Sequence, residues 1–108
     1  TAYVSEHLWI RSPGPVGFLI TCREGVDRNK LVQEIESKGV QTRMLFAGNL
    51  TKHPCFDQMR ATGKGYRIAG SLENTDRIMK DTFWIGVYPG MTDEMLSAMA
   101  DAIKEALN

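Results

Sequence analysis

The pattern of hydrophobic and polar positions predicts three β-strands in this chain. They cover 16–23, 40–46 and 83–88, and a period of two residues is the pattern of a strand with two distinct faces. The first strand is apolar on both faces, so we expect it in the centre of a sheet. Its predicted faces are Phe18, Ile20 and Cys22 on one side and Leu19 and Thr21 on the other.

Two amphipathic helices with clear capping signals are also predicted. Asp27 is a good N-cap for a helix over 28–38, and Gly39 supplies the left-handed position that often follows a helix. Thr92 is expected to cap the last helix, which carries a continuous apolar stripe. This stripe consists of Met95, Leu96, Met99, Ile103, Ala106 and Leu107.

The middle of the chain carries weaker signals. Pro54 favours a short helix over 54–60, because proline fits the first turn of a helix. Residues 61–70 contain three glycines but lack the spacing of a phosphate loop, so we expect an irregular surface loop. Asn74 or Thr75 is then expected to cap a third helix. The side of this helix predicted to be buried comprises Ile78, Met79 and Phe83.

The order β-α-β-(α)-α-β-α indicates an α/β (α+β) fold. Helices should cover one face of a small sheet of three strands, to which the preceding residues could add a fourth. Residues 1–15 contain the sequence Ser12-Pro13-Gly14-Pro15, which is typical of a linker, because proline fixes φ and removes a donor. We therefore expect 1–15 to be a lead-in or linker and 16–108 to be the folded unit. The strand order stays open.

Composition narrows the classes of function. The formal net charge of the 108 residues is zero, whereas nucleic acids and acidic membranes attract clustered excess cations, so we expect neither partner. No apolar run approaches the roughly 20 residues of a membrane span, and the first residues lack the order of a secretory signal. We expect a cytoplasmic protein, and the start at Thr1 favours a fragment of a longer chain.

The cysteines, histidines and carboxylates of this chain do not have the spacing of a metal site or of an acid–base pair. Cys22 and Cys55 match no metal or redox spacing and are expected to be reduced structural thiols. His7 and His53 lie far apart in the sequence without an evident third ligand. No two carboxylates are paired for acid–base work. We therefore expect no metal and no complete catalytic site in this chain.

The best candidate for ligand contact begins with the stretch 42–51, TRMLFAGNLT, in which a strand runs into a Gly-Asn loop. Gly48 in this loop permits close backbone approach or a positive φ. Arg43 precedes the loop, and its guanidinium suits either an anion or a salt bridge at the sheet edge. Lys52 and His53 could join it around a phosphate, with Asn49 offering amide hydrogen bonds to a polar ligand. The pattern leaves both interpretations of Arg43 open.

Two longer motifs, TRMLFAGNLTKHPCF and NTDRIMKDTFWIGVYPGMT, resemble the C-terminal end of a known enzyme family. They are similar to RfbH-type CDP-4-keto-6-deoxyglucose 3-dehydratases, in the DegT-type branch of vitamin-B6-dependent proteins with the aminotransferase fold. The resemblance covers nearly the whole chain from about Phe18 onward, and both motifs are long and specific. Residues 61–70 match more loosely.

The resemblance implies that this chain is the small C-terminal domain of a fold-type-I PLP-dependent transferase, docked on its own large domain. The intact enzyme, a homodimeric lyase, would use pyridoxamine 5′-phosphate (PMP) and a [2Fe–2S] cluster supplied with electrons by a partner reductase. Its product would be a 3,6-dideoxy sugar for lipopolysaccharide O-antigen. The cofactor does the difficult chemistry in such enzymes, and the large domain would hold it, so this chain alone would be inactive.

The resemblance also points to substrate-binding residues by position. Arg43, Asn49, Lys52 and His53 would contact the nucleotide sugar, and Phe46 would form an apolar wall. Two alternatives stay open. The chain could come from a PLP-dependent sugar aminotransferase, or it could be a stand-alone interaction module without enzymatic activity.

Overall fold

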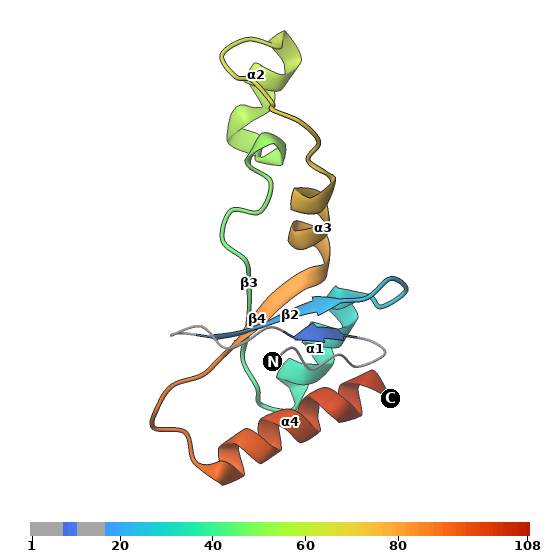
Figure 1. Cartoon of the computed structure of the whole chain (residues 1–108), viewed down its shortest axis with the longest axis vertical. Helices are drawn as coiled ribbons and strands as arrows, with labels where there is room; N and C mark the ends of the chain where they lie inside the picture. Colours follow the sequence, from blue (N-terminus) through green and yellow to red (C-terminus); the bar gives the residue numbers. More distant parts are fainter. Residues whose placement is uncertain (1–7, 11–16) are drawn as a thin grey trace.

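The computed structural model describes residues 8–10 and 17–108 and shows an elongated molecule, in which a long arm rises from a body that contains a sheet (Figure 1). The molecule measures 53 × 30 × 28 Å, with a Cα radius of gyration of 16.5 Å. A compact domain of this length would have a radius of about 13 Å. We call residues 45–81 the arm and the other described residues the body.

The body holds a four-stranded antiparallel sheet in the order β1-β2-β4-β3. The strands are β1 (Leu8–Ile10), β2 (Gly17–Cys22), β3 (Thr42–Met44) and β4 (Thr82–Gly86). Ile20 pairs with Phe83 between β2 and β4, and Arg43 pairs with Trp84 between β3 and β4. The predicted central position of β2 is confirmed, because it has a neighbour on each side. The fourth strand does come from the lead-in, as β1.

Helices α1 (Arg28–Ser37) and α4 (Asp93–Leu107) pack against the sheet and against each other (Figure 1). The buried cluster draws side chains from β2, α1 and β4, and the C-terminal half of α4 packs against it. Its members are Ile20, Cys22, Leu31, Val32, Ile35, Phe83 and Ile85. The expected α/β (α+β) architecture is therefore confirmed, with its core entirely in the body.

Both predicted caps in the body are confirmed. The Asp27 carboxylate accepts hydrogen bonds from the backbone N–H groups of Asn29 (2.9 Å) and Lys30 (3.2 Å). The Thr92 hydroxyl accepts one from the backbone N–H of Met95 at 3.2 Å. These side chains satisfy donors that the first turn of a helix leaves without a partner.

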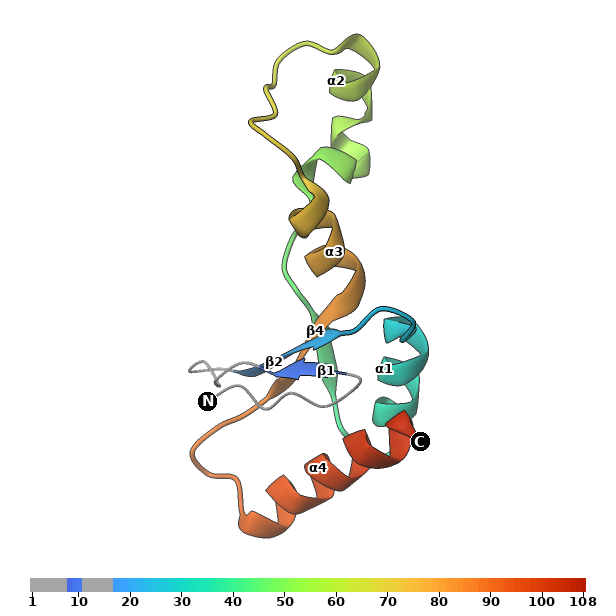
Figure 2. The ribbon, with the colours of Figure 1, turned by 45° about the vertical axis from the view of Figure 1, so that its right-hand side comes forward.

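The predicted apolar stripe of α4 is buried only along part of its length. Met99, Ile103, Ala106 and Leu107 pack against the core. Met95 and Leu96 are each 43% exposed, because the first turns of α4 lie away from α1 (Figure 2). The predicted amphipathic stripe is therefore present, and the core covers it from Met99 onward.

The arm contains two 3₁₀ turns and two short helices. The elements are η1 (Leu50–Lys52), η2 (Pro54–Phe56), α2 (Asp57–Thr62) and α3 (Glu73–Asp81), and α3 runs directly into β4 (Figure 1). The short helix predicted at Pro54 is present, divided between η2 and α2. All residues of the arm are described, and Asn49 is the only one among them that is buried. The arm therefore has no hydrophobic core of its own.

The predicted start of α3 is wrong. The helix begins at Glu73, whose N–H donates to the hydroxyl of Ser71 at 3.2 Å, so Asn74 and Thr75 lie inside its first turn. Its predicted buried side is also wrong, since Ile78 is 44% exposed and Phe83 belongs to β4. Ile78 is exposed because α3 stands in the arm, where no core covers its apolar face, whereas Phe83 is buried in the body.

Candidate functional site

The predicted ligand-binding stretch forms the base of the arm, where the chain leaves β3 and packs against α3. Gly48 has φ of +60°, as its position in the loop predicted. A Cβ at Gly48 would lie 2.6 Å from Cγ of Met79. Only glycine allows the loop to lie this close to α3 in this conformation.

Asn49 holds the base of the arm together. Its side-chain oxygen accepts hydrogen bonds from the N–H (3.0 Å) and the hydroxyl (2.6 Å) of Thr51. Asn49 is thereby the N-cap of η1. Its side-chain nitrogen donates to Oδ1 of Asp76 in α3 at 2.6 Å. Asn49 is 2% exposed. The structure thus gives Asn49 an internal role, and its contact with substrate stays a prediction.

Lys52 and Asn49 both contact the carboxylate of Asp76. The ammonium nitrogen of Lys52 is 3.1 Å from the same Oδ1 of Asp76. The hydrogen bond from Asn49, followed by the interaction with Lys52, lowers the pKa of the Asp76 carboxyl below its usual value. An ammonium has three donors, and the side chain of Lys52 is 55% exposed. Lys52 can therefore contact an anion while it keeps its pair with Asp76.

Arg43 and Phe46 form a second group, around Trp84. Arg43 is exposed and donates to its neighbour's carbonyl, Thr42 O, at 2.9 Å. It forms no ion pair with any residue that the structure describes, so the edge salt bridge is not observed within 8–10 and 17–108. Phe46 is 86% exposed and contacts Trp84 edge to face, with ring centroids 6.1 Å apart.

His53 lies at the turn between η1 and η2. Its Nε2 contacts the carbonyl oxygen of Ala47, and its own carbonyl accepts a hydrogen bond from Arg60 at 2.9 Å. The structure therefore distributes the five predicted residues over three local settings. Asn49 and Lys52 meet at Asp76, Arg43 and Phe46 meet at Trp84, and His53 packs on backbone.

The end of the arm holds a cavity that the sequence did not indicate. It has a volume of about 250 Å³ and is lined mainly by apolar side chains from η1, η2, α2 and the glycine-containing loop. We call it the cup, and its lining includes Leu50, Thr51, Phe56, Met59, Arg60 and Tyr66. A signal was available, because Tyr66 lies between the cations Lys64 and Arg67 in a loop whose other residues, apart from Ile68, are small.

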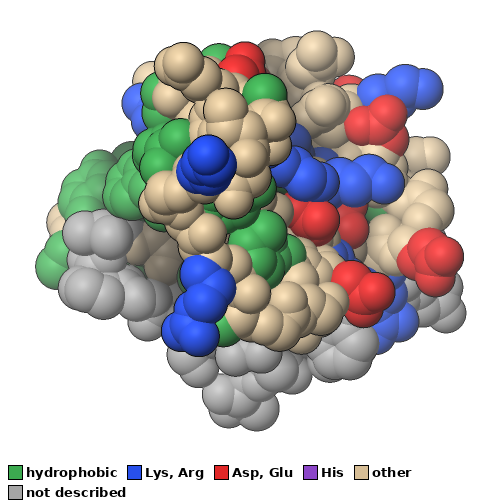
Figure 3. All heavy atoms as spheres, turned by 90° about the horizontal axis from the view of Figure 1, so that it is seen from above, with side chains coloured by type: hydrophobic (Ala, Val, Ile, Leu, Met, Phe, Trp, Pro, Cys, Tyr) green, Lys and Arg blue, Asp and Glu red, His purple; other side chains and the backbone are tan. Residues whose placement is uncertain are grey.

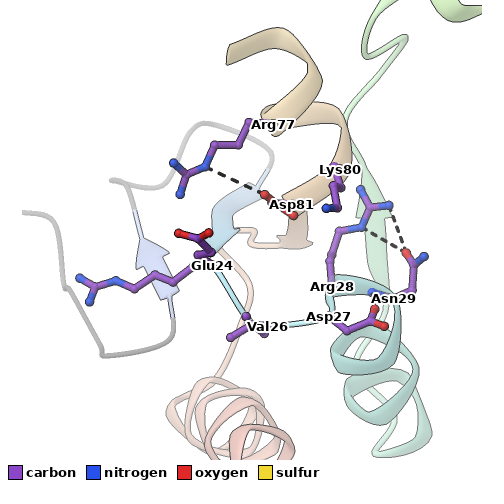
Figure 4. A pocket seen from close by; sticks show the side chains of 10 residues that line it. Glu24, Val26, Asp27, Arg28, Asn29, Arg77, Lys80 and Asp81 are labelled. Carbon is purple, nitrogen blue, oxygen red and sulfur yellow. Dashed lines mark hydrogen bonds and ion pairs between the residues drawn. The ribbon is translucent and has the colours of Figure 1, made fainter. Parts of the chain in front are cut away.

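A larger cavity of about 700 Å³ lies where the arm meets the body (Figure 4). Its lining mixes cations with acids, and several of these groups already have partners. Arg28 donates to the carbonyl oxygens of Met79 (2.6 Å) and Thr82 (3.3 Å), and Arg77 lies 4.0 Å from Asp81. The contacts of Arg28 join α1 to the end of α3, whereas the Arg77–Asp81 pair lies within α3. We therefore interpret this cavity as the junction that sets the direction of the arm.

The remaining reactive groups offer no further site in the described part of the chain. Cys22 and Cys55 are both free; burial raises the pKa of the Cys22 thiol to about 11, whereas Cys55 is exposed. Among residues 8–10 and 17–108 there is no group of three side chains of the metal-binding types placed to hold an ion. No described helix has the length and hydrophobicity needed to cross a lipid bilayer.

Known proteins that are similar to this chain include enzymes named as sugar 3-dehydratases. The sequence pattern of the DegT/DnrJ/EryC1/StrS aminotransferase family matches residues 6–104. Over 95 residues the chain is 45% identical to a dTDP-4-dehydro-2,6-dideoxy-D-glucose 3-dehydratase from Saccharopolyspora spinosa, covering 86% of this chain and 20% of that protein. Over 95 residues it is also 45% identical to the lipopolysaccharide biosynthesis protein RfbH of Salmonella typhimurium, covering 86% of this chain and 21% of that protein. The chain spans about a fifth of the length of these relatives.

Solved structures show the same fold. A crystal structure of GDP-4-keto-6-deoxymannose-3-dehydratase with a trapped PLP-glutamate geminal diamine matches 96% of this chain and 26% of its own, with a TM-score of 0.65 and 20% identity. The E. coli GDP-4-keto-6-deoxy-D-mannose-3-dehydratase with bound hydrated PLP matches 94% of this chain and 26% of its own, with a TM-score of 0.66 and 19% identity. Arm and body together thus correspond to about a quarter of each of these chains.

Proposed function

Since this chain belongs to the DegT/DnrJ/EryC1/StrS aminotransferase family, we propose that it is one lobe of a nucleotide-sugar 3-dehydratase. The observation that carries the proposal is the 45% identity, over 95 residues, to a protein named as a sugar 3-dehydratase. The likeness to RfbH supports a role in lipopolysaccharide biosynthesis. The substrate in this proposal is CDP-4-keto-6-deoxyglucose and the product is a 3,6-dideoxy sugar of the O-antigen, made in the cytoplasm.

The cofactors belong to the rest of the longer protein in this proposal, because the residues described here do not fit them. A [2Fe–2S] cluster takes four ligands, usually thiolates, whereas Cys22 is buried in the core as a neutral thiol and Cys55 lies on the arm. The cup has no carboxylate in its lining to pair with the ring nitrogen of PMP, and its one cation, Arg60, already binds Asp57 and backbone carbonyls. At the junction, Arg28 is engaged in joining α1 to the end of α3. In this proposal the large domain holds PMP and the cluster, and a partner reductase supplies the electrons. The intact enzyme is a homodimer.

The base of the arm is the part of this lobe that faces the substrate. Lys52 and Arg43 are exposed cations that can bind a phosphate or a sugar hydroxyl. Asn49 acts on Lys52 through Asp76, to which both side chains bond. Phe46 is largely exposed here, and a large domain docked against it would turn this ring into the wall of a cleft.

An exchange of segments tests the proposal. In the Saccharopolyspora spinosa enzyme, the segment aligned with this chain is replaced by the present sequence, and the chimera is assayed with dTDP-4-dehydro-2,6-dideoxy-D-glucose. We expect 3-dehydratase activity to be retained. The variant Arg43→Gln/Lys52→Gln should lower kcat/KM by about 10- to 100-fold, the loss expected for two charged contacts. The double substitution Lys30→Gln/Lys104→Gln on the body removes the same charge and should have no effect.

The outcomes separate the proposal from its rival. A chimera that folds and dimerises like the parent enzyme but does not dehydrate the sugar would contradict the proposed function. Transfer of an amino group to the sugar would instead favour a sugar aminotransferase, which the description of the matching family makes the second candidate.

A further inference from the structure

The cup lies directly beside the residues proposed to bind the sugar. Leu50 and Thr51 line it, and they stand in the chain between Asn49 and Lys52. Its volume of about 250 Å³ suits a single flat ring. Phe56 and Tyr66 are 36% and 42% exposed and provide the aromatic part of its lining. The cup therefore continues the predicted substrate site toward the end of the arm.

The rim of the cup is cationic. Residues 58–72 contain Arg60, Lys64 and Arg67 and no Asp or Glu. Arg60 contacts Asp57 and the carbonyl oxygens of Thr51 and His53, so it stabilises the arm itself. Seen from the end of the arm, hydrophobic side chains form a patch with cationic side chains next to it (Figure 3).

Two of these cations have no partner in the described part of the chain. Lys64 and Arg67 form no ion pair or hydrogen bond with any residue that the structure describes, and both are exposed. They are the sequence neighbours of Gly65 and Tyr66, which line the cup. A Cβ at Gly65, where φ is +88°, would lie 2.7 Å from the Cε atom of Met59. The loop that carries the two cations thus lies close against α2.

We propose that the cup binds the nucleoside diphosphate end of a nucleotide sugar. The flat face of the base lies against Tyr66 and Phe56, since aromatic side chains stack on any base. The phosphates lie beside Lys64 and Arg67, which form no ion pair with any described acid. This inference rests on the proposed function, and it assigns the nucleotide to the outer part of the arm and the sugar to the base.

An acidic peptide with an apolar anchor would also suit an apolar cavity with a cationic rim. The position of the cup favours the nucleotide, because a nucleotide sugar carries its sugar beyond the base and the phosphates. Leu50 and Thr51 line the cup and directly precede Lys52 and His53, the residues predicted to contact that sugar. An acidic peptide bound in the cup would not need to extend to these two residues. It is kept as an outcome of the test.

The test is a titration of the 108-residue chain, followed by the ¹⁵N–¹H NMR spectrum, with CDP, dTDP, cytidine and inorganic pyrophosphate. We expect saturable shifts in 50–72 with CDP or dTDP and binding at least about tenfold weaker with cytidine or pyrophosphate alone, because each supplies half of the contacts. Lys64→Gln/Arg67→Gln and, separately, Tyr66→Ala should each weaken CDP binding by about tenfold or more. Lys30→Gln/Lys104→Gln, which removes the same charge from the body, should leave it unchanged.

Several results would overturn the inference. These are the absence of saturation by about 10 mM CDP or dTDP, shifts confined to the body, and equal weakening by the control variant. Binding of an acidic peptide carrying one Phe, with no competition from CDP, would assign the cup to a protein partner instead. An active chimera whose kcat/KM does not respond to Tyr66→Ala would remove this inference and keep the proposed function, whereas an inactive chimera with intact CDP binding would do the opposite.

Discussion

At the scale of single residues, Asp76 organises the base of the arm. It accepts the hydrogen bond of Asn49 and the ammonium of Lys52 on the same oxygen, Oδ1. The residues that looked like ligand contacts in the sequence therefore depend on an acid in α3 that the sequence did not associate with them. Because Asn49 is the only buried residue of the arm, the rigidity of the base depends on this polar contact.

We predict that Asp76→Asn loosens the base of the arm. The pKa of Asp76 is lowered in the fold, chiefly by Asn49 and then by Lys52. The stabilisation is therefore present above the unfolded pKa, near 3.8, and is lost as the pH falls through the lower folded value. At neutral pH the variant should raise the hydrogen-exchange rates of the amides of residues 49–53 by about threefold, the scale of one exposed ion pair.

The same exchange experiment in the parent chain should show the loss at acid pH, below the unfolded pKa of the carboxyl. Asp101→Asn serves as a control, because this exposed acid of α4 lies far along the chain from the arm. Unchanged exchange at residues 49–53 in Asp76→Asn would show that the contact contributes nothing to the order of the loop.

At the scale of secondary-structure elements, the junction between α1 and α3 decides where the arm points. The last carbonyl groups of a helix have no partner within the helix. Arg28, at the start of α1, donates to Met79 O in the last turn of α3 and to Thr82 O at the start of β4. One guanidinium thus joins the body to the point where the arm begins (Figure 4).

We predict that Arg28→Met releases α3 from α1 without disturbing the core. Methionine keeps an apolar stem of similar length but cannot donate, and a hydrogen bond from a charged group is worth about 1.5–3 kcal/mol. Because Arg28 is half-buried, we expect α3 amides to open at a free-energy cost lower by about 1–2 kcal/mol. Native-state hydrogen exchange measures this directly, with amides of β2 as the internal reference.

Arg28→Lys provides a graded control, since it keeps the charge but loses the planar pair of donors. Its effect on α3 should lie between those of the parent and Arg28→Met. Equal loss of protection in α3 and β2 would mean that the substitution destabilises the whole domain and that Arg28 is not a local clamp.

At the scale of the whole molecule, the body and the arm differ in what stabilises them. All seven residues of the buried cluster belong to the body, while the arm exposes large apolar side chains, among them Phe46, Leu50, Tyr66 and Ile68. Hydrophobic burial is the main favourable term in folding. The body should therefore fold by itself, and the arm gains most of its stability where other groups cover these side chains.

We predict that the body folds without the outer arm. When residues 50–72 are replaced by a short Gly-Ser linker, unfolding by denaturant should stay cooperative, with a free energy of unfolding within about 1 kcal/mol of the parent chain. The radius of gyration from small-angle X-ray scattering should fall toward that of a compact domain. Loss of a cooperative transition would show that the arm contributes to the core.

The sequence by itself determined the features that depend on neighbours along the chain. The caps Asp27 and Thr92, the positive φ of Gly48 and the three strands all follow from contacts within a few residues or from a simple period of two. The family resemblance likewise follows from contiguous motifs, and the matched family confirms it. These predictions succeed because the forces that decide them act between atoms that the chain already holds close together.

Only the tertiary structure decided which apolar faces are covered and which polar groups are paired. Ile78 and Leu96 look like core residues in their helices, yet they are exposed, because their elements extend beyond the sheet. Asn49 meets Asp76 across 27 residues, and Arg28 reaches Met79 across 51. No local pattern encodes such distances, since burial and pairing depend on how whole elements pack against each other in space.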